Sequence, residues 1–301
     1  MSDLAAKNAH DVAWEVVERP DMAPADRNKV FLRRIMETPR IYQVWYEPGY
    51  VYPRHQHPVD EIFYILRGDF TINGHDLREG SMIYVPKNTK YGPEYTGKDG
   101  VLFLRVELWD TEEGPPGSQA RGVNIKAWTG GETADGLPDV PGPKAAPTPE
   151  EQRSLETAEA TRSVSAADRP WMETTREMSD GRQATTYCSR NLMAPTPSVT
   201  QVLHRPRYVQ PLHQHEVDEC FYFLRGELED GDLRFTPGSV YFIPKNTPYG
   251  GVSRTDEGAL YLRIVLQDSE AKRETVPSGI MPRPWSGPLD PEGVPVLTPS
   301  G

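Results

Sequence analysis

The chain has 301 residues, of which 37% are hydrophobic and 26% are charged, as is typical of a soluble globular protein with room for two domains. Its formal net charge of −11 argues against a nucleic-acid partner, because such affinity comes mainly from Lys and Arg that neutralise phosphates. No signal-peptide pattern opens the chain, and no apolar run reaches the ~18–20 residues that span a bilayer. With only two cysteines, Cys188 and Cys220, we expect a cytoplasmic protein with no membrane partner.

The first half of the chain predicts a series of β-strands. Runs rich in β-branched and aromatic residues are separated by Gly, Pro, Asn or Asp, at a spacing typical of sandwiches and barrels. There is no alternation of strands and helices and no Gly-rich phosphate loop, so a dinucleotide-binding domain is not expected. The runs lie at 41–49, 61–68, 69–74, 81–86 and 101–108.

A loop and a helix are expected in the middle of the chain. Residues 111–148 are rich in Pro, Gly and polar residues and predict a loop. A helix is predicted over 148–163, with Thr148 as N-cap, Pro149 at the first helical position and Glu151 completing a capping box.

The second half repeats the first. Residues 42–110 align with 200–268 without a gap, at an offset of 158, and about 31 of the 69 positions are identical. The period is too long for a solenoid and suits two complete domains. We therefore divide the chain into an N-terminal domain with a Pro/Gly-rich trailing segment, a linker helix and a C-terminal domain with a Pro-rich tail, at 1–147, 148–163 and 164–301.

Each half carries a cluster with the chemistry of a metal site. His55 and His57 lie two residues apart, so on a strand both side chains face the same way, and Glu61 follows after a short turn. Two imidazoles and one carboxylate are the donors of non-haem Fe(II) oxygenases and also of catalytic zinc sites. The second half repeats the cluster as His213, His215 and Glu219.

These residues resemble the cupin family. "GYVYPRHQHPVDEIFYILRG" (49–68) matches the first cupin motif, and the second copy departs from it only at Arg207, in place of the first Gly. The second motif is partly kept in "GSMIYVPKNTKY" and "GSVYFIPKNTPY", where Asn88 and Asn246 replace a Gly. The resemblance implies an all-β chain of two tandem double-stranded β-helix (cupin, jelly-roll-like) barrels packed as a pseudo-dimer.

The second motif also departs from the family at a metal ligand. Tyr91 and Tyr249 stand where the family usually has its fourth ligand, a His. As phenolates they would ligate the metal, and as phenols they would donate a hydrogen bond or act as general acid or base. Candidate substrate-binding residues are Arg105, Arg263, Gln43, Gln201 and His204.

The resemblance and the donor set imply a metal-dependent enzyme. We expect a non-haem iron dioxygenase acting on a small organic substrate, aromatic or dicarbonyl, with O2 as second substrate. The metal is expected to be Fe(II), with Zn, Ni or Mn as alternatives. A redox-neutral lyase or isomerase, or a non-catalytic cupin that binds metal or a small ligand, are the alternative functions. The chain is expected to be a monomeric pseudo-dimer or a homo-oligomer.

Overall fold

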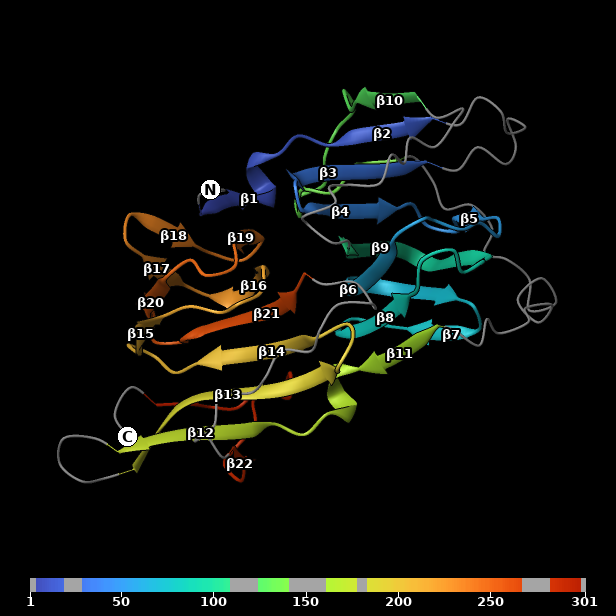
Figure 1. The fold of residues 1–301 in the computed structure, drawn as a ribbon. Coiled ribbons are helices and arrows are strands. Elements are labelled where there is room, and N and C mark those ends of the chain that lie inside the picture. Colours follow the sequence, from blue (N-terminus) through green and yellow to red (C-terminus); the bar gives the residue numbers. More distant parts are fainter. Residues whose placement is uncertain are drawn as a thin grey trace. The chain divides into compact units, whose positions relative to one another are not determined.

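A computed structural model describes residues 4–18, 29–108, 124–140, 161–177, 183–266 and 282–298 (Figure 1). These residues form β-strands and two short 3-10 turns, so the expected all-β fold is confirmed. The chain divides into two compact units, which we call the N-terminal barrel (Ala9–Ser165) and the C-terminal barrel (Met1–Asn8 with Ala166–Gly301). Within the described ranges, no helix is long and apolar enough to cross a membrane.

The N-terminal barrel is built on one bent sheet of ten strands. Its order is β10-β2-β3-β4-β9-β6-β8-β11, and β5 and β7 pair with the far ends of β9 and β6. Its neighbouring strands are antiparallel. The strands are β2 (Glu15–Glu18), β3 (Val30–Glu37), β4 (Arg40–Tyr46), β5 (Val51–Tyr52), β6 (Asp60–Ile72), β7 (His75–Leu77), β8 (Ser81–Val85), β9 (Glu94–Leu108), β10 (Asn124–Ala127) and β11 (Arg162–Ser165).

Gly68 forms the corner at which β6 bends across the barrel. The β6–β9 register shifts twice around this residue, between Ile65 and Arg67 and between Gly68 and Phe70. Gly68 has φ +86°, and a Cβ placed there would lie 2.1 Å from the carbonyl oxygen of Gly100. Only glycine allows two backbones to approach so closely, which explains the last Gly of the first motif.

The C-terminal barrel has the same strands arranged as two sheets. One sheet has the order β1-β19-β16-β21-β14-β13-β12-β22 and the other β15-β20-β17-β18. Gly226, the equivalent of Gly68, ends β16 with φ +72°. The strands are β1 (Ala5–Asn8), β12 (Met172–Glu177), β13 (Gln183–Met193), β14 (Val199–His204), β15 (Val209–His213), β16 (Glu219–Gly226), β17 (Leu228–Asp230), β18 (Leu233–Phe235), β19 (Ser239–Ile243), β20 (Tyr249–Ser253), β21 (Ala259–Val265) and β22 (Arg283–Pro284).

The leading strand of each sequence repeat belongs to the barrel formed by the other repeat. β1, at the start of the chain, pairs antiparallel with β19 of the C-terminal barrel. β11, at the equivalent place in the second repeat, pairs with β8 of the N-terminal barrel (Figure 1). Each strand covers a sheet edge that would otherwise expose unpaired backbone groups.

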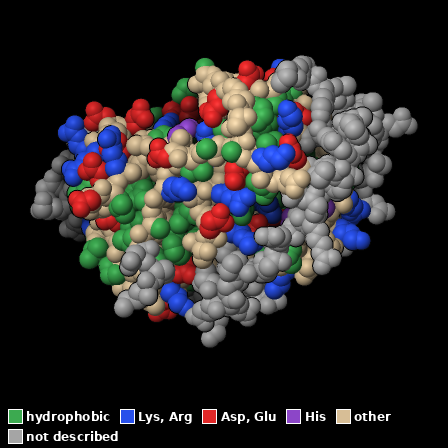
Figure 2. Space-filling view, turned by 90° about the horizontal axis from the view of Figure 1, so that it is seen from above, with side chains coloured by type: hydrophobic (Ala, Val, Ile, Leu, Met, Phe, Trp, Pro, Cys, Tyr) green, Lys and Arg blue, Asp and Glu red, His purple; other side chains and the backbone are tan. Residues whose placement is uncertain are grey.

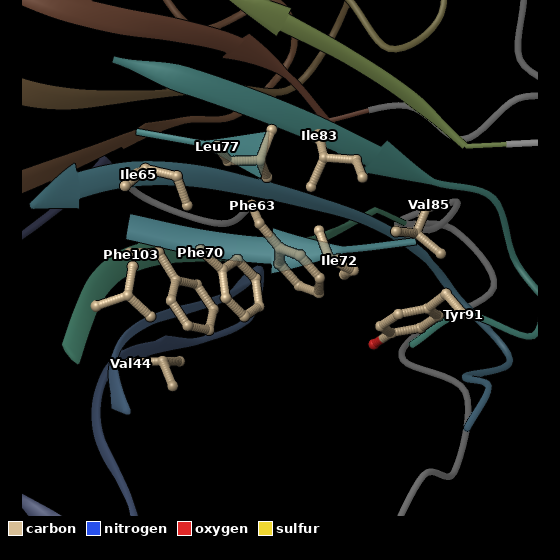
Figure 3. Close-up of a cluster of buried hydrophobic side chains, with 11 residues drawn as sticks. Val44, Phe63, Ile65, Phe70, Ile72, Leu77, Ile83, Val85, Tyr91 and Phe103 are labelled. Carbon is tan, nitrogen blue, oxygen red and sulfur yellow. The ribbon is translucent and has the colours of Figure 1, made fainter. Parts of the chain in front are cut away.

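The interior of each barrel is filled with aromatic and β-branched side chains. Tyr91 lies at one end of the N-terminal cluster, beside Val85, and its hydroxyl points toward the interior (Figure 3). Phe70 and Phe103 stack with ring centroids 5.5 Å apart. The buried members of this cluster are Val44, Phe63, Ile65, Phe70, Ile72, Leu77, Ile83, Val85, Tyr91, Val101 and Phe103.

Some expectations about the middle of the chain fall outside the structure. Of the predicted helix over 148–163, residues 148–160 lie outside the described residues, whereas Arg162 and Ser163 lie in strand β11. Most of the loop expected at 111–148 is likewise not described, and residues 124–127 of it form β10.

On the face shown in Figure 2, basic and acidic side chains are interspersed with apolar ones.

The departures from the family motifs keep the backbone conformation of glycine. Arg207, Asn88 and Asn246 have φ values of 59°, 60° and 59°. Asn tolerates this left-handed region better than other non-glycine residues do, so its presence in both copies preserves the turn before Tyr91 and Tyr249.

Candidate functional site

In each barrel, the two histidines of the motif lie side by side just before the strand that begins at or near the motif glutamate, which is β6 in the N-terminal barrel and β16 in the C-terminal barrel. In the N-terminal barrel the ring centroids of His55 and His57 are 5.1 Å apart and the planes are perpendicular, at 87°. His55 is fixed to Tyr91 by two reciprocal backbone hydrogen bonds of 2.9 Å. The C-terminal barrel reproduces the pair, with His213 and His215 5.2 Å apart.

The hydrogen bonds of His55 determine its tautomer. Its Nδ1 lies 3.0 Å from the carbonyl oxygen of Pro53, which can only accept a hydrogen bond, so Nδ1 carries the proton and Nε2 keeps a lone pair. Burial lowers the pKa of His55 to about 4, with a further contribution from His57, so the ring is neutral at pH 7. His213 makes the same contact with Pro211, at 2.8 Å. A neutral imidazole with a free Nε2 is the form that binds metals.

Glu61 is fully buried at the start of β6 and is held by two residues. The Tyr91 hydroxyl donates a hydrogen bond of 2.9 Å to Oε2. Arg105 donates to Oε1 through Nε, at 2.7 Å, and through Nη2. The two bonds from Arg105 occupy Oε1, whereas Oε2 accepts one bond from Tyr91 and retains a lone pair.

The C-terminal barrel holds Glu219 in the same way. Tyr249 donates to Oε2 at 3.0 Å, and Arg263 binds Oε1. Burial and the neighbouring carboxylate raise the pKa of Tyr91 and of Tyr249 well above the usual value for tyrosine. In this structure each tyrosine hydroxyl donates a hydrogen bond to the glutamate of its motif.

Arg105 connects Glu61 to a second carboxylate. Its Nη2 lies 3.1 Å from Oε1 of Glu107, and Arg40 lies 3.1 Å from Oε2 of Glu107. The Arg105 side chain is 22% exposed, whereas that of Glu61 is fully buried.

The two glutamines predicted to bind substrate lie on the other face of their strands. Gln43 precedes Val44, which faces the interior, so Gln43 lies on the face of Trp45. Gln201 accepts a hydrogen bond of 2.5 Å from Arg190, which stacks on Trp171 with its guanidinium carbon 4.4 Å from the ring centroid. The structure therefore does not bring the glutamines together with the histidines.

His204 faces the interior of the C-terminal barrel, but as a neutral buried group. Its Nε2 is 3.2 Å from the Tyr261 hydroxyl, and burial lowers its pKa to about 3. It replaces Tyr46 of the N-terminal barrel. The interiors of the two barrels therefore differ in their polar groups.

Glu94, at the start of β9, was missed by the sequence reasoning. It is 1% exposed, and its Oε1 lies 4.0 Å from Nε2 of His55. Its Oε2 has no hydrogen-bond partner among the described residues. Burial raises the pKa of Glu94 to about 8, although a hydrogen bond from Tyr46 opposes the shift. The available signal was the alignment of the repeats, which places Val252 opposite this carboxylate.

The donors suit a divalent metal in their chemistry, although they are not gathered around one point. Within the described ranges, no group of three or more His, Cys, Asp or Glu side chains lies close enough together to hold a metal ion. The neutral Nε2 of His55 and the remaining lone pair of Glu61 Oε2 are donors of the kinds that such a metal takes.

A family comparison identifies one domain of the chain. Residues 43–107 match the family model of the cupin domain, Cupin_2. Residues 43–107 therefore form a cupin domain. Among curated proteins, none matches the sequence.

Solved structures extend the likeness over both barrels. A "putative dioxygenase" of Nostoc punctiforme is 14% identical with a TM-score of 0.58, covering 92% of this chain and 88% of that protein. The oxalate decarboxylase of Bacillus subtilis, in a study of its Mn(II) centres, is 15% identical with a TM-score of 0.54, covering 90% and 79%. The same enzyme at pH 4.6 is 16% identical with a TM-score of 0.52, covering 89% and 77%. At these identities the likeness establishes the fold.

Proposed function

We propose that the protein is a metal-dependent cupin enzyme that acts on a small organic substrate, and more specifically an Fe(II) dioxygenase of an aromatic or dicarbonyl compound. The observation that carries the proposal is the neutral His55, whose Nε2 is kept free by the hydrogen bond of Nδ1 to Pro53, at 3.0 Å. His213 makes the same Nδ1 contact, with Pro211 at 2.8 Å, and its Nε2 lies 3.5 Å from the amide nitrogen of Gln210. A ligand tautomer held in both barrels is what a metal site requires of its protein.

The residues that would hold the metal are the two histidines and the glutamate of each motif. When bound, the metal would supply a Lewis acid and a redox centre. Arg105 and Tyr91 orient Glu61, and Arg263 and Tyr249 do the same for Glu219. The proposed ligands are His55, His57 and Glu61 in the N-terminal barrel and His213, His215 and Glu219 in the C-terminal barrel.

The substrate class follows from the groups around the histidines. Tyr52 and Tyr91 have ring centroids 4.6 and 4.3 Å from that of His55, which favours a planar organic substrate. Arg105 uses Nε and Nη2 for its described contacts, so Nη1 offers donors to a carbonyl or carboxylate oxygen.

Oxygen consumption tests the reaction type. Protein loaded with Fe(II) is mixed with catechols, β-diketones or oxalate, and dissolved O2 and substrate are followed together. A dioxygenase consumes O2 in step with one of these substrates. Turnover that continues without O2 refutes the oxygenase for that substrate. Metal binding without any turnover supports the non-catalytic function instead.

A redox-neutral lyase or isomerase is the second candidate, and a specific observation favours it. Buried acid–base groups surround His55: Tyr91 is a protonated phenol, and the pKa of Glu94 is about 8, close to neutrality. General acids and bases work best when their pKa is near the working pH. Under this function, the anaerobic arm of the same experiment shows full activity with Zn, Ni or Mn.

A further inference from the structure

His204 is a buried imidazole with one ring nitrogen that lacks a partner. It is 2% exposed, and it lies on the same face of β14 as Val202, which belongs to the interior cluster of the C-terminal barrel. Its Nε2 lies 3.2 Å from the Tyr261 hydroxyl, whereas its Nδ1 has no hydrogen-bond partner among the described residues. Because nearly all buried polar atoms in folded proteins are hydrogen-bonded, this Nδ1 marks a place for a polar group that the described side chains do not supply.

The pair of His204 and Tyr261 suits a hydroxyl group in particular. Burial lowers the pKa of His204 to about 3 and raises that of Tyr261, so at pH 7 the imidazole is neutral and the phenol is protonated. If Tyr261 donates to Nε2, then Nδ1 carries a hydrogen and needs an acceptor. If Nε2 donates to Tyr261, then Nδ1 has a lone pair and needs a donor. A hydroxyl group is both donor and acceptor, so it fits either state.

A line of aromatic rings joins His204 to the metal motif of its barrel. The ring centroids of His204 and Tyr261 lie 5.4 Å apart, and those of Tyr261 and Phe221 lie 4.7 Å apart. Tyr249 continues the line, with its centroid 5.6 Å from that of Phe221 and 4.2 Å from that of His213. Ring faces that end in a single polar group suit a planar compound whose body packs on the rings and whose hydroxyl fixes its orientation.

The N-terminal barrel has other residues at these two positions. Tyr46 stands in place of His204 and Phe103 in place of Tyr261. The strand pairing agrees with this equivalence, because β14 pairs with β21 in the same register as β4 with β9. Tyr46 packs on Phe103 with ring centroids 5.1 Å apart, and its hydroxyl is hydrogen-bonded to Glu94. The imidazole and its hydroxyl partner therefore belong to the C-terminal barrel alone.

We propose that His204 is a specificity-determining residue of the C-terminal barrel, where it binds with Tyr261 the hydroxyl group of a planar organic substrate, and that the N-terminal barrel does not share this preference. The inference rests on the proposed function, which takes a small organic compound as substrate. Recognition rather than acid–base catalysis is the role, because a pKa of about 3 makes His204 a weak base at neutral pH. The two barrels of the duplicated chain are then sites of different specificity.

Phenol and fluorobenzene test the inference, because the two probes have similar size and differ in the hydroxyl group. Protein labelled with ¹⁵N at histidine gives separate NMR signals for the ring nitrogens, and the His204 signals are those lost in His204→Tyr. Under anaerobic conditions phenol is expected to shift these signals until they saturate, with an affinity at least ~10-fold above that of fluorobenzene. The signals of His75, which contacts Thr161 and Ser163 in the N-terminal barrel, should not move.

A matched pair of variants separates recognition from packing. Tyr261→Phe introduces the residue of the N-terminal barrel and is expected to lower the affinity for phenol ~10-fold, with that for fluorobenzene unchanged. Tyr241→Phe is the control, because it removes a buried hydroxyl of the same barrel that already donates to Asp230, at 2.8 Å. It should leave both affinities unchanged.

The wild-type titration decides the matter even where a variant fails to fold. His204 signals that do not move with phenol, as expected if only water meets Nδ1, or that move equally with both probes, overturn the inference. A phenol preference that is unchanged in folded Tyr261→Phe overturns it as well. In each case, turnover of a substrate in the oxygen-consumption experiment leaves the proposed function standing.

Discussion

Arg105 holds Glu61 through a single carboxylate oxygen, which accepts hydrogen bonds from both Nε and Nη2 of the guanidinium. Arg263 binds Glu219 in the second barrel, also through Oε1. In both barrels a fixed positive charge stands beside the glutamate of the metal motif. Any cation that binds Glu61 must share that carboxylate with Arg105.

Arg105→Ala should destabilise the protein by about 3–5 kcal/mol, because it leaves Glu61 as a buried charge without its partner. Urea denaturation of the metal-free protein measures the loss. Added divalent metal should recover part of it by taking over Glu61. Arg67→Ala is the control, since Arg67 and Asp135 are 53% and 63% exposed and such pairs contribute ~0–1 kcal/mol. Equal losses in the two variants would contradict the assignment.

Tyr91→Phe should cost about 1–3 kcal/mol, because Glu61 loses a hydrogen-bond donor in a buried position. Tyr249→Phe should cost a similar amount in the other barrel. If the tyrosines only orient the glutamates, Mn(II) stoichiometry stays the same in both variants. A tyrosinate charge-transfer absorption in the Fe(III)-loaded wild type, absent in Tyr91→Phe, would instead show that Tyr91 is itself a ligand.

Gly226→Ala should destabilise the C-terminal barrel by ~3 kcal/mol or more. The residue has φ +72°, and the added Cβ would lie 2.0 Å from the carbonyl oxygen of Gly258. Gly231→Ala is the matched control: it also has positive φ, +58°, but no atom lies within 4 Å of the added Cβ. The control should cost only the ~1–2 kcal/mol of a left-handed alanine. Thermal unfolding of both variants compares them directly, and similar Tm values would refute the close-approach explanation.

Deletion of residues 1–8 should loosen the C-terminal barrel, although these residues begin the first sequence repeat. β1 pairs with β19, and Asn8 donates from Nδ2 to Thr236 Oγ1 and Ser239 Oγ at 3.1 and 3.0 Å. Hydrogen exchange should therefore accelerate in 239–243. A protein that lacks only residues 1–3 is the control. Exchange that accelerates in the N-terminal barrel instead would contradict the strand assignment.

The sequence predicts the barrels well because residues that the barrel backbone requires occur at the same positions in both repeats. Gly68 and Gly226 occur in both copies because the strand corner requires them, and the Asn at 88 and 246 keeps the left-handed turn. The pairing of Glu61 with Arg105 could not be predicted. It depends on the register between β6 and β9, which places Phe63 opposite Arg105.

Glu94 and the exchanged strands were missed for different reasons. A carboxylate opposite a valine in the aligned repeats is visible in the sequence, but its burial is decided by packing. The pairing of β1 with β19 joins Ala5 to Phe242, and local sequence patterns carry no information about contacts so far apart in the chain. Both features depend on tertiary structure rather than on local preference.

The pairing of β1 with β19 and of β11 with β8 also determines when each barrel can be completed during translation. At ~5–20 residues per second, roughly 10–50 s separate the synthesis of Ala5 from that of its neighbour Phe242. The first barrel waits only until Ser165 has emerged. Strand β1 is thus synthesised long before β19, the strand with which it pairs. A ribosome stalled between the two repeats would leave β1 without this partner strand.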